Sequence, residues 1–83
     1  MRVQVRYFAS LREALGSGET VELPDGSTAA ALREQLIARG GRHAQALDRK
    51  RAVRCAVNQQ MADEDTVLVD GAEVAFFPPV TGG

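Results

Sequence analysis

Polar and apolar residues alternate in four separate segments of this chain, and a period of two is that of half-buried β-strands. The segments are residues 2–7, 19–23, 53–57 and 73–77. A sheet built from such strands has one apolar face, which another layer must cover. The pattern therefore restricts the chain to folds in which a sheet packs against a covering layer.

One amphipathic helix can provide that layer. Apolar residues recur at helical spacing through residues 29–39, which predicts the main helix of the fold. Ser27 or Thr28 is expected to cap the start of this helix, and Gly40-Gly41 is expected to end it.

Shorter segments complete the predicted order. Ser10 and Glu13 stand at capping-box spacing, so we expect a short helix over residues 11–15. Residues 66–69 should form a short extended piece, whereas residues 42–51 have weak periodicity and should be irregular, with one helical turn. The order strand, strand, helix, strand, short strand, strand fits an α+β roll of the β-grasp, ubiquitin-like type.

The length of 83 residues and the hydrophobic share of 45% suit one globular domain. We expect a β-grasp domain over residues 1–77, with a mixed sheet of about four to five strands packed on one main helix. Residues 78–83 should form an extended C-terminal tail. The strand order comes from analogy with the fold.

The charge balance limits the classes of partner. A formal net charge of −1 argues against a nucleic-acid binder that works through a basic face. The run Arg49-Lys50-Arg51 fits a solvated loop, with contact to an acidic partner surface as the alternative. The N-terminus lacks the pattern of a signal peptide or a membrane span, so we expect a cytoplasmic location and no membrane partner.

Few side chains could carry catalysis or hold a metal. Cys55 is the only cysteine, and its parity with the valines on either side predicts a buried apolar thiol rather than a nucleophile. His43 is the only histidine and is expected to be exposed in a loop. Paired carboxylates, a Ser/His arrangement, metal-ligand spacing and a phosphate loop are all missing from the sequence, so we expect no catalytic constellation and no bound metal or cofactor.

The C-terminal end is the most unusual segment. Phe76-Phe77-Pro78-Pro79 is followed by Val80-Thr81-Gly82-Gly83, and no charged side chain occurs after Glu73. The prolines cannot donate backbone hydrogen bonds and favour an extended chain, while the two glycines carry no side chain. These features predict a thin, uncharged arm whose carboxylate could enter a narrow channel of another protein. A frayed terminus without a role is the alternative for the Gly-Gly pair taken alone.

The tail and three other segments resemble the small, sulfur-carrying subunit of molybdopterin synthase, a ubiquitin-like family. The resemblance covers essentially the whole chain at matching spacing. It is carried by residues 70–83, by Val5–Glu13, by Ala31-Leu32-Arg33 and by Ala56-Val57-Asn58-Gln59.

The resemblance implies a chemistry located at Gly83. An activating enzyme would use ATP to adenylate the Gly83 carboxylate, and a sulfur donor protein would convert the product to a thiocarboxylate, a 1-thioglycine. The large synthase subunit, with which the family suggests a heterotetramer, would then pass the sulfur to cyclic pyranopterin monophosphate to form molybdopterin. Gly82 would give the tail its access, and the acid-base groups would belong to the large subunit.

Alternation also predicts where a partner would bind. Phe8 has the parity of the outward residues of the first strand, and Phe77 that of the outward residues of the last. Exposed aromatic rings are typical of interface cores, although either ring could instead tuck under a loop or lie beneath the helix. Met61 and Arg12 are expected nearby. The predicted interface comprises Phe8, Arg12, Met61, Phe77, Pro78, Pro79, Val80 and Thr81.

Two other interpretations stay open. The chain could be a sulfur carrier of another pathway, such as thiamine synthesis, tRNA thiolation or conjugation to lysines, because these proteins share the fold and the Gly-Gly end. It could also be a ubiquitin-like interaction module whose tail has no chemical role, in which case blocking the C-terminus would be harmless.

Overall fold

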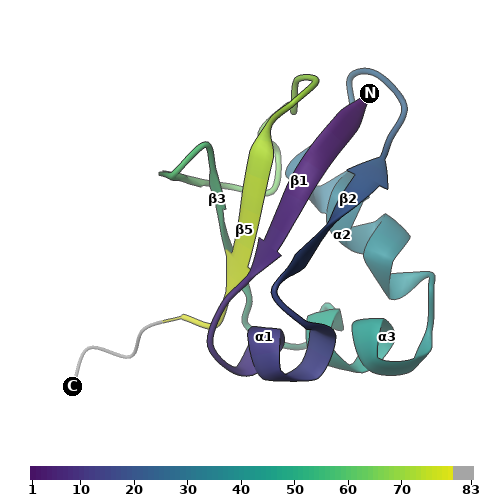
Figure 1. Cartoon of the computed structure of the whole chain (residues 1–83), viewed down its shortest axis with the longest axis vertical. Helices are drawn as coiled ribbons and strands as arrows, with labels where there is room; N and C mark the ends of the chain where they lie inside the picture. The colour runs from purple at the N-terminus through teal and green to yellow at the C-terminus, as the bar shows by residue number, and fades with distance from the viewer. Residues whose placement is uncertain (80–83) are drawn as a thin grey trace.

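The computed structural model describes residues 1–79 (Figure 1). Its elements are β1 (Arg2–Tyr7), α1 (Ser10–Leu15), β2 (Gly18–Glu22), α2 (Ala29–Ile37), α3 (Gly41–Leu47), β3 (Arg54–Val57), β4 (Gln60–Ala62) and β5 (Glu73–Phe77). The four alternating segments are the four longest strands, as predicted.

The strands form one mixed sheet in the order β2-β1-β5-β3-β4. The central strands β1 and β5 run parallel, and every other neighbouring pair is antiparallel. Together with α2 across one face, this is the β-grasp roll expected from the sequence (Figure 1).

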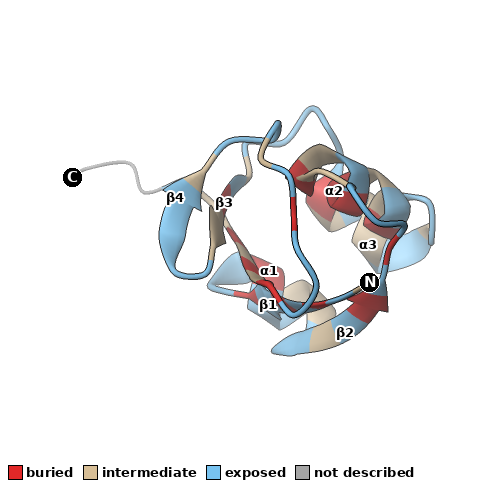
Figure 2. Ribbon diagram, turned by 90° about the horizontal axis from the view of Figure 1, so that it is seen from above, coloured by how far each residue is buried: buried red, intermediate tan, exposed pale blue. Residues whose placement is uncertain are grey.

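A single core lies between the sheet and the helices. Its most deeply buried side chains come from the inward positions of β1 and β5, from α2 and α3, and from the segment before β5, and Figure 2 shows how these buried positions are distributed over the elements. They are Val3, Val5, Tyr7, Leu32, Leu36, Leu47, Leu68 and Val74.

The helix α3 occupies a segment expected to be irregular. Gly40, at φ 76°, turns the chain after α2 and serves as the N-cap of α3. The helix buries only Leu47, so its apolar periodicity is weak. Its sequence therefore carries little of the signal by which helices are predicted, and contacts with other elements stabilise it.

The short strand also lies elsewhere than predicted. Residues 66–69 form one isolated bridge, Thr28 to Val67, and contribute Leu68 to the core. The additional strand is β4, which forms a hairpin with β3. The two residues of its turn, Asn58 and Gln59, have φ of 50° and 68°, the left-handed geometry of tight hairpins.

The predicted N-terminal cap is found at one helix only, whereas α1 ends before Gly16 as expected from the sequence. Thr28 Oγ1 accepts a hydrogen bond from the Ala31 amide at 3.2 Å and caps α2, which ends at Ile37, two residues early. The capping box at Ser10 is wrong, because α1 begins at Ser10 and Ala9 takes the N-cap position without a side-chain bond. Ala9 has φ 54°, which turns the chain sharply out of β1.

Candidate functional site

The tail begins at the edge of a well-paired region. β5 ends at Phe77, and the Phe8 amide donates to the Phe76 carbonyl at 3.1 Å, so the end of β5 is tied to the end of β1. Pro78 is half-buried and Pro79 is exposed. The predicted tail residues Val80, Thr81, Gly82 and Gly83 lie outside the described residues.

One row of outward-facing residues crosses all five strands. From β2 to β4 its members are Gly18, Arg6, Ala75, Ala56 and Met61, each paired with the next in the register. On β1, β5 and β3 the sequence neighbours of these residues point into the core, so the row lies on the sheet face opposite α2.

The predicted aromatic residues flank this row. Tyr7 pairs with Phe76, which brings Phe8 and Phe77 next to each other one position further along the strands. Phe8 is 41% exposed and Phe77 is half-buried, so neither ring is covered by α2. The Arg6 guanidinium lies 5.8 Å from the centre of the Phe8 ring, within cation–π range.

Met61 is 56% exposed at the β4 edge of the same face. Ala56 and Ala75 lie between Met61 and the rings of Phe8 and Phe77, so a continuous row of apolar side chains runs from β4 to β1. We call Phe8, Ala56, Met61, Ala75 and Phe77 the outer apolar band. The sequence did not predict that Ala56 belongs to this band, because its membership depends on the strand order.

Arg12 lies beside this band on α1. Its backbone amide approaches the Phe8 carbonyl at 3.4 Å, and its side chain is exposed. Within residues 1–79 no carboxylate lies within ion-pair distance of its guanidinium. The structure thus brings together Phe8, Arg12, Phe77, Pro78 and Pro79 at one end of the sheet, with Met61 further along the band.

Cys55 is buried, as its parity predicted. Its Sγ approaches the Ala62 carbonyl at 3.5 Å. Burial, assisted by the negative charges of Glu64 and Asp63, raises the pKa of the Cys55 thiol. A thiol that is buried and harder to ionise is a poor nucleophile.

A half-buried polar cluster, missed from the sequence, joins β1, β2, α3 and the turn after α2 around Glu19. Tyr7 Oη donates to Glu19 Oε2 at 2.9 Å, His43 Nε2 lies 3.0 Å from the same oxygen, and Arg39 pairs with Oε1. The prediction of an exposed His43 in a loop is wrong, since the residue lies on α3 with its ring edge-on to Tyr7.

The partners of Glu19 account for its ionisation. Burial by itself would raise the pKa of Glu19, but the hydrogen bonds from His43, Arg39 and Tyr7 outweigh it and lower that pKa. Burial and the bond to Glu19 raise the pKa of Tyr7. Because its two oxygens already bind three neighbouring side chains, Glu19 serves to connect elements rather than to bind a substrate.

The described residues offer neither a cluster of metal ligands nor a membrane-spanning helix. No group of three His, Cys, Asp or Glu side chains among them could hold a metal ion. None of the helices in residues 1–79 has the length and apolar character to cross a membrane.

Comparison with known proteins identifies the family. The profile of the ThiS family matches residues 5–83, which is nearly the whole chain. The chain belongs to the ThiS family. Together with the relatives and solved structures described next, this match confirms the fold and the resemblance that the sequence predicted.

Relatives within this group are named as sulfur carriers. The molybdopterin synthase sulfur carrier subunit of Escherichia coli is 44% identical over 81 residues, covering 98% of this chain and 99% of the relative. The subunit of the same name from Mycobacterium tuberculosis is 40% identical over 100% of this chain and 99% of its own.

Solved structures show the same fold in this group. A putative subunit 1 of the molybdopterin converting factor from Pyrococcus furiosus has a TM-score of 0.80 and 32% identity, covering 96% of this chain and 99% of that one. A second match, with a TM-score of 0.71, 25% identity and full coverage of both chains, comes from a complex of subunits 1 and 2 of that factor in Helicobacter pylori.

Proposed function

We propose that this chain is the sulfur carrier of molybdenum cofactor synthesis and acts as the sulfur-donating subunit of molybdopterin synthase. The observation that carries the proposal is the full-length match, at 44% identity, to a molybdopterin synthase sulfur carrier subunit. The match to a chain solved in complex with subunit 2 of the same factor supports a partner subunit.

The chemistry follows from the properties of a carboxylate at Gly83. A carboxylate oxygen is a poor leaving group, so an activating enzyme would join the Gly83 carboxylate to AMP, using ATP and releasing pyrophosphate. A sulfur donor protein would then supply sulfur at the oxidation level of sulfide; this sulfur would attack the carbonyl carbon and expel AMP, and the product would be the thiocarboxylate. This ATP-dependent step supports the cytoplasm as the location.

Sulfur delivery would take place in the large subunit. There the thiocarboxylate sulfur would bond to cyclic pyranopterin monophosphate, and water would cleave the resulting thioester, which leaves the sulfur on the substrate and returns Gly83 to the carboxylate. Two such deliveries would build the dithiolene. The acid-base groups would come from the large subunit, because in residues 1–79 the one cluster of titratable groups is tied up by its own hydrogen bonds. A heterotetramer of two small and two large subunits is the assembly we propose.

We further propose that the outer apolar band docks on this partner and aims the tail. Phe8 and Phe77 adjoin the root of the tail, and Met61, whose side chain can adapt to more than one partner, ends the band. Arg12, Pro78 and Pro79 lie at the same end, and Val80, Thr81 and Gly82 would continue into the partner's channel. If the activating enzyme uses the same surface, the two complexes exclude each other.

The test is the mass of the intact protein after incubation with ATP, the activating enzyme and the sulfur donor. We expect one oxygen to be replaced by sulfur at Gly83, and deletion of Gly83 to leave docking nearly normal while abolishing sulfur transfer. An unmodified carboxylate under these conditions would favour the interaction module. Thiocarboxylate that supports thiazole synthesis or tRNA thiolation, but not molybdopterin formation, would favour another pathway.

A further inference from the structure

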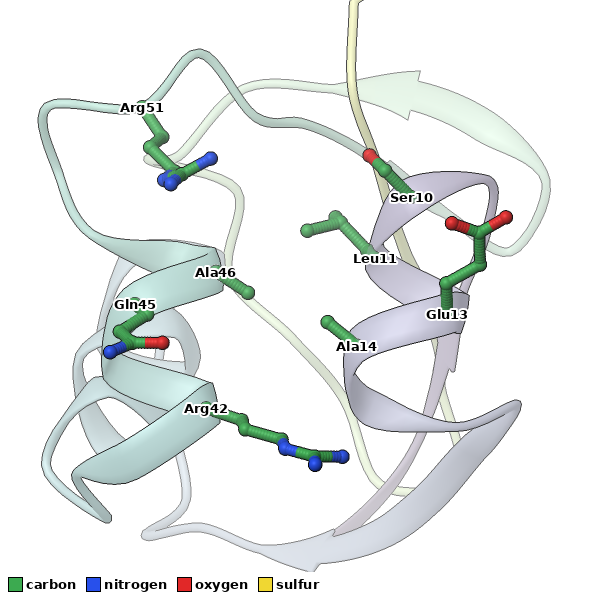
Figure 3. A pocket seen from close by; sticks show the side chains of 8 residues that line it. All are labelled: Ser10, Leu11, Glu13, Ala14, Arg42, Gln45, Ala46 and Arg51. Carbon is green, nitrogen blue, oxygen red and sulfur yellow. The ribbon is translucent and has the colours of Figure 1, made fainter.

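A groove of about 440 Å³ lies between α1 and α3 (Figure 3), and none of the residues that line it belongs to the outer apolar band. A second, smaller hollow shares Ser10, Leu11, Ala46 and Arg51 with it and reaches Pro78. The groove is therefore continuous with the root of the tail. We call the eight residues that line the larger hollow the α1–α3 groove; they are Ser10, Leu11, Glu13, Ala14, Arg42, Gln45, Ala46 and Arg51.

The floor of the groove is apolar and its ends are cationic. Leu11, Ala14 and Ala46 face the space between the helices, and the side chains of Arg42 and Arg51 extend into it from opposite ends (Figure 3). Within residues 1–79, neither guanidinium has a carboxylate within 4.0 Å. Glu13, the one acidic residue that lines the groove, turns away from them in Figure 3.

Both cationic ends are held in place by polar contacts. At the N-terminal end of α3, His43 binds Glu19 next to Arg42. At the other end, buried Arg33 donates to the carbonyl oxygens of Leu47 and Asp48 at 2.8 and 2.7 Å and to that of Arg51 at 3.0 Å. The backbone that carries the two free guanidinium groups is thus ordered before any ligand binds, which reduces the entropy lost on binding.

The cations continue around the tail. Arg6 and Arg12 adjoin Phe8, and Arg54 pairs with Phe77 in the register. None of these three arginines has an ion-pair partner in residues 1–79 either. Although the formal net charge of the chain is −1, four arginines without an ion-pair partner in residues 1–79 thus lie close to the root of the tail: Arg6, Arg12, Arg51 and Arg54.

We infer that the α1–α3 groove binds an acidic segment of the large synthase subunit, with a small apolar side chain of that segment seated on Leu11, Ala14 and Ala46. The inference rests on the proposed function and extends its docking surface from the sheet around the tail root. Charge complementarity favours carboxylates opposite Arg42 and Arg51. Five of the eight lining residues are exposed, so the groove is open along its length, which suits a protein segment better than an enclosed small molecule.

The test measures binding of the large subunit from the same organism to the full chain at about 50 mM and about 300 mM salt, because exposed charge pairs weaken as salt rises. We expect Arg42→Gln/Arg51→Gln to weaken affinity about tenfold at low salt, mainly through slower association, and less than about threefold at high salt. The matched control, Arg2→Gln/Lys50→Gln, removes the same charge outside the groove; Lys50 adjoins Arg51 but lines a different hollow.

The outcomes separate the two proposals. Failure of the unaltered chain to bind the large subunit would overturn the proposed function, and this inference with it. The inference alone would be overturned if the unaltered chain binds normally and the two double variants lose equal affinity. It would also be overturned if neither double variant loses affinity. Thermal unfolding of both double variants checks that the fold is kept. Ala46→Asp is a second probe: it places a carboxylate on the groove floor, where it should repel an acidic segment and weaken binding.

Discussion

Arg33 Nε donates to the carbonyl oxygen of Leu47 at 2.8 Å, joining the middle of α2 to the last residue of α3. The same guanidinium reaches the carbonyl oxygens of Asp48 and Arg51 and the Glu64 carboxylate. Arg33 is only 7% exposed, so its guanidinium is largely shielded from water, although the Glu64 side chain is exposed. One buried fork thus holds the loop between α3 and β3, which carries one end of the α1–α3 groove.

Replacement of Arg33 by Met should therefore destabilise the fold by about 3 kcal/mol, because three carbonyl oxygens lose a charged donor in a shielded site. Urea unfolding measures the change. Arg33→Lys, which keeps the charge but not the planar fork, should lose an intermediate amount. Arg2→Met, which breaks only an exposed pair with Glu22, should change stability little. Equal stability of Arg33→Met and the unaltered chain would show that the fork is dispensable.

Glu19 should make the free energy of unfolding depend on pH in the acidic range. Its pKa is lowered in the native state from an ordinary value of 4.5, so the native form binds the proton less readily than the unfolded chain. This contribution is fully present above the ordinary value and is lost as the pH falls through the native pKa. The midpoint of urea unfolding should drop between about pH 5 and pH 3, and Glu19→Gln should show a shallower drop. If the midpoints of the unaltered chain and of Glu19→Gln fall in parallel as the pH is lowered, other carboxylates cause the loss of stability.

Phe76 and Phe77 are consecutive phenylalanines that lie on opposite faces of the sheet. Phe76 is 2% exposed in the core, whereas Phe77 is half-buried on the outer face. Phe76→Ala should cost about 3–5 kcal/mol of stability. Phe77→Ala should instead weaken binding of the large subunit by at least about tenfold, with a much smaller loss of stability. If both variants lose stability equally, Phe77 belongs to the core.

Val69→Ala provides the control for binding. Val69 is 62% exposed but lies in the segment before β5, outside the outer apolar band. Its truncation should leave affinity for the large subunit unchanged, which would separate a specific band from a general loss of apolar surface.

Gly18 is required by the close pairing of β1 and β2. A Cβ at this position would lie 2.3 Å from the Val5 carbonyl oxygen, and φ is 158°. Gly18→Ala should therefore destabilise the sheet by about 1–3 kcal/mol, measured by thermal unfolding. Gly26 also has a positive φ, 84°, but open space at its Cβ position, so Gly26→Ala should cost less. A ranking in the opposite order would show that the β1–β2 edge relaxes freely.

Period-two patterns determined much of the fold without any tertiary information. Because side chains of a strand alternate between faces, the sequence correctly predicted which residues of β1 and β5 are buried and that Phe8 and Phe77 face outward. The chemistry proposed for the tail also needed only the sequence, since it depends on the order Pro-Pro-Val-Thr-Gly-Gly and on a resemblance along the chain.

Tertiary structure decided what local patterns could not encode. α3 has one buried apolar residue, and contacts from Glu19 and Arg33, distant in sequence, hold it in place. Ala56 joins the outer apolar band because β3 lies beside β5, and Arg42 and Arg51 face one groove because α3 packs beside α1. Periodicity is a property of neighbours along the chain, whereas buried polar contacts, grooves and cross-strand neighbours arise only when distant segments meet.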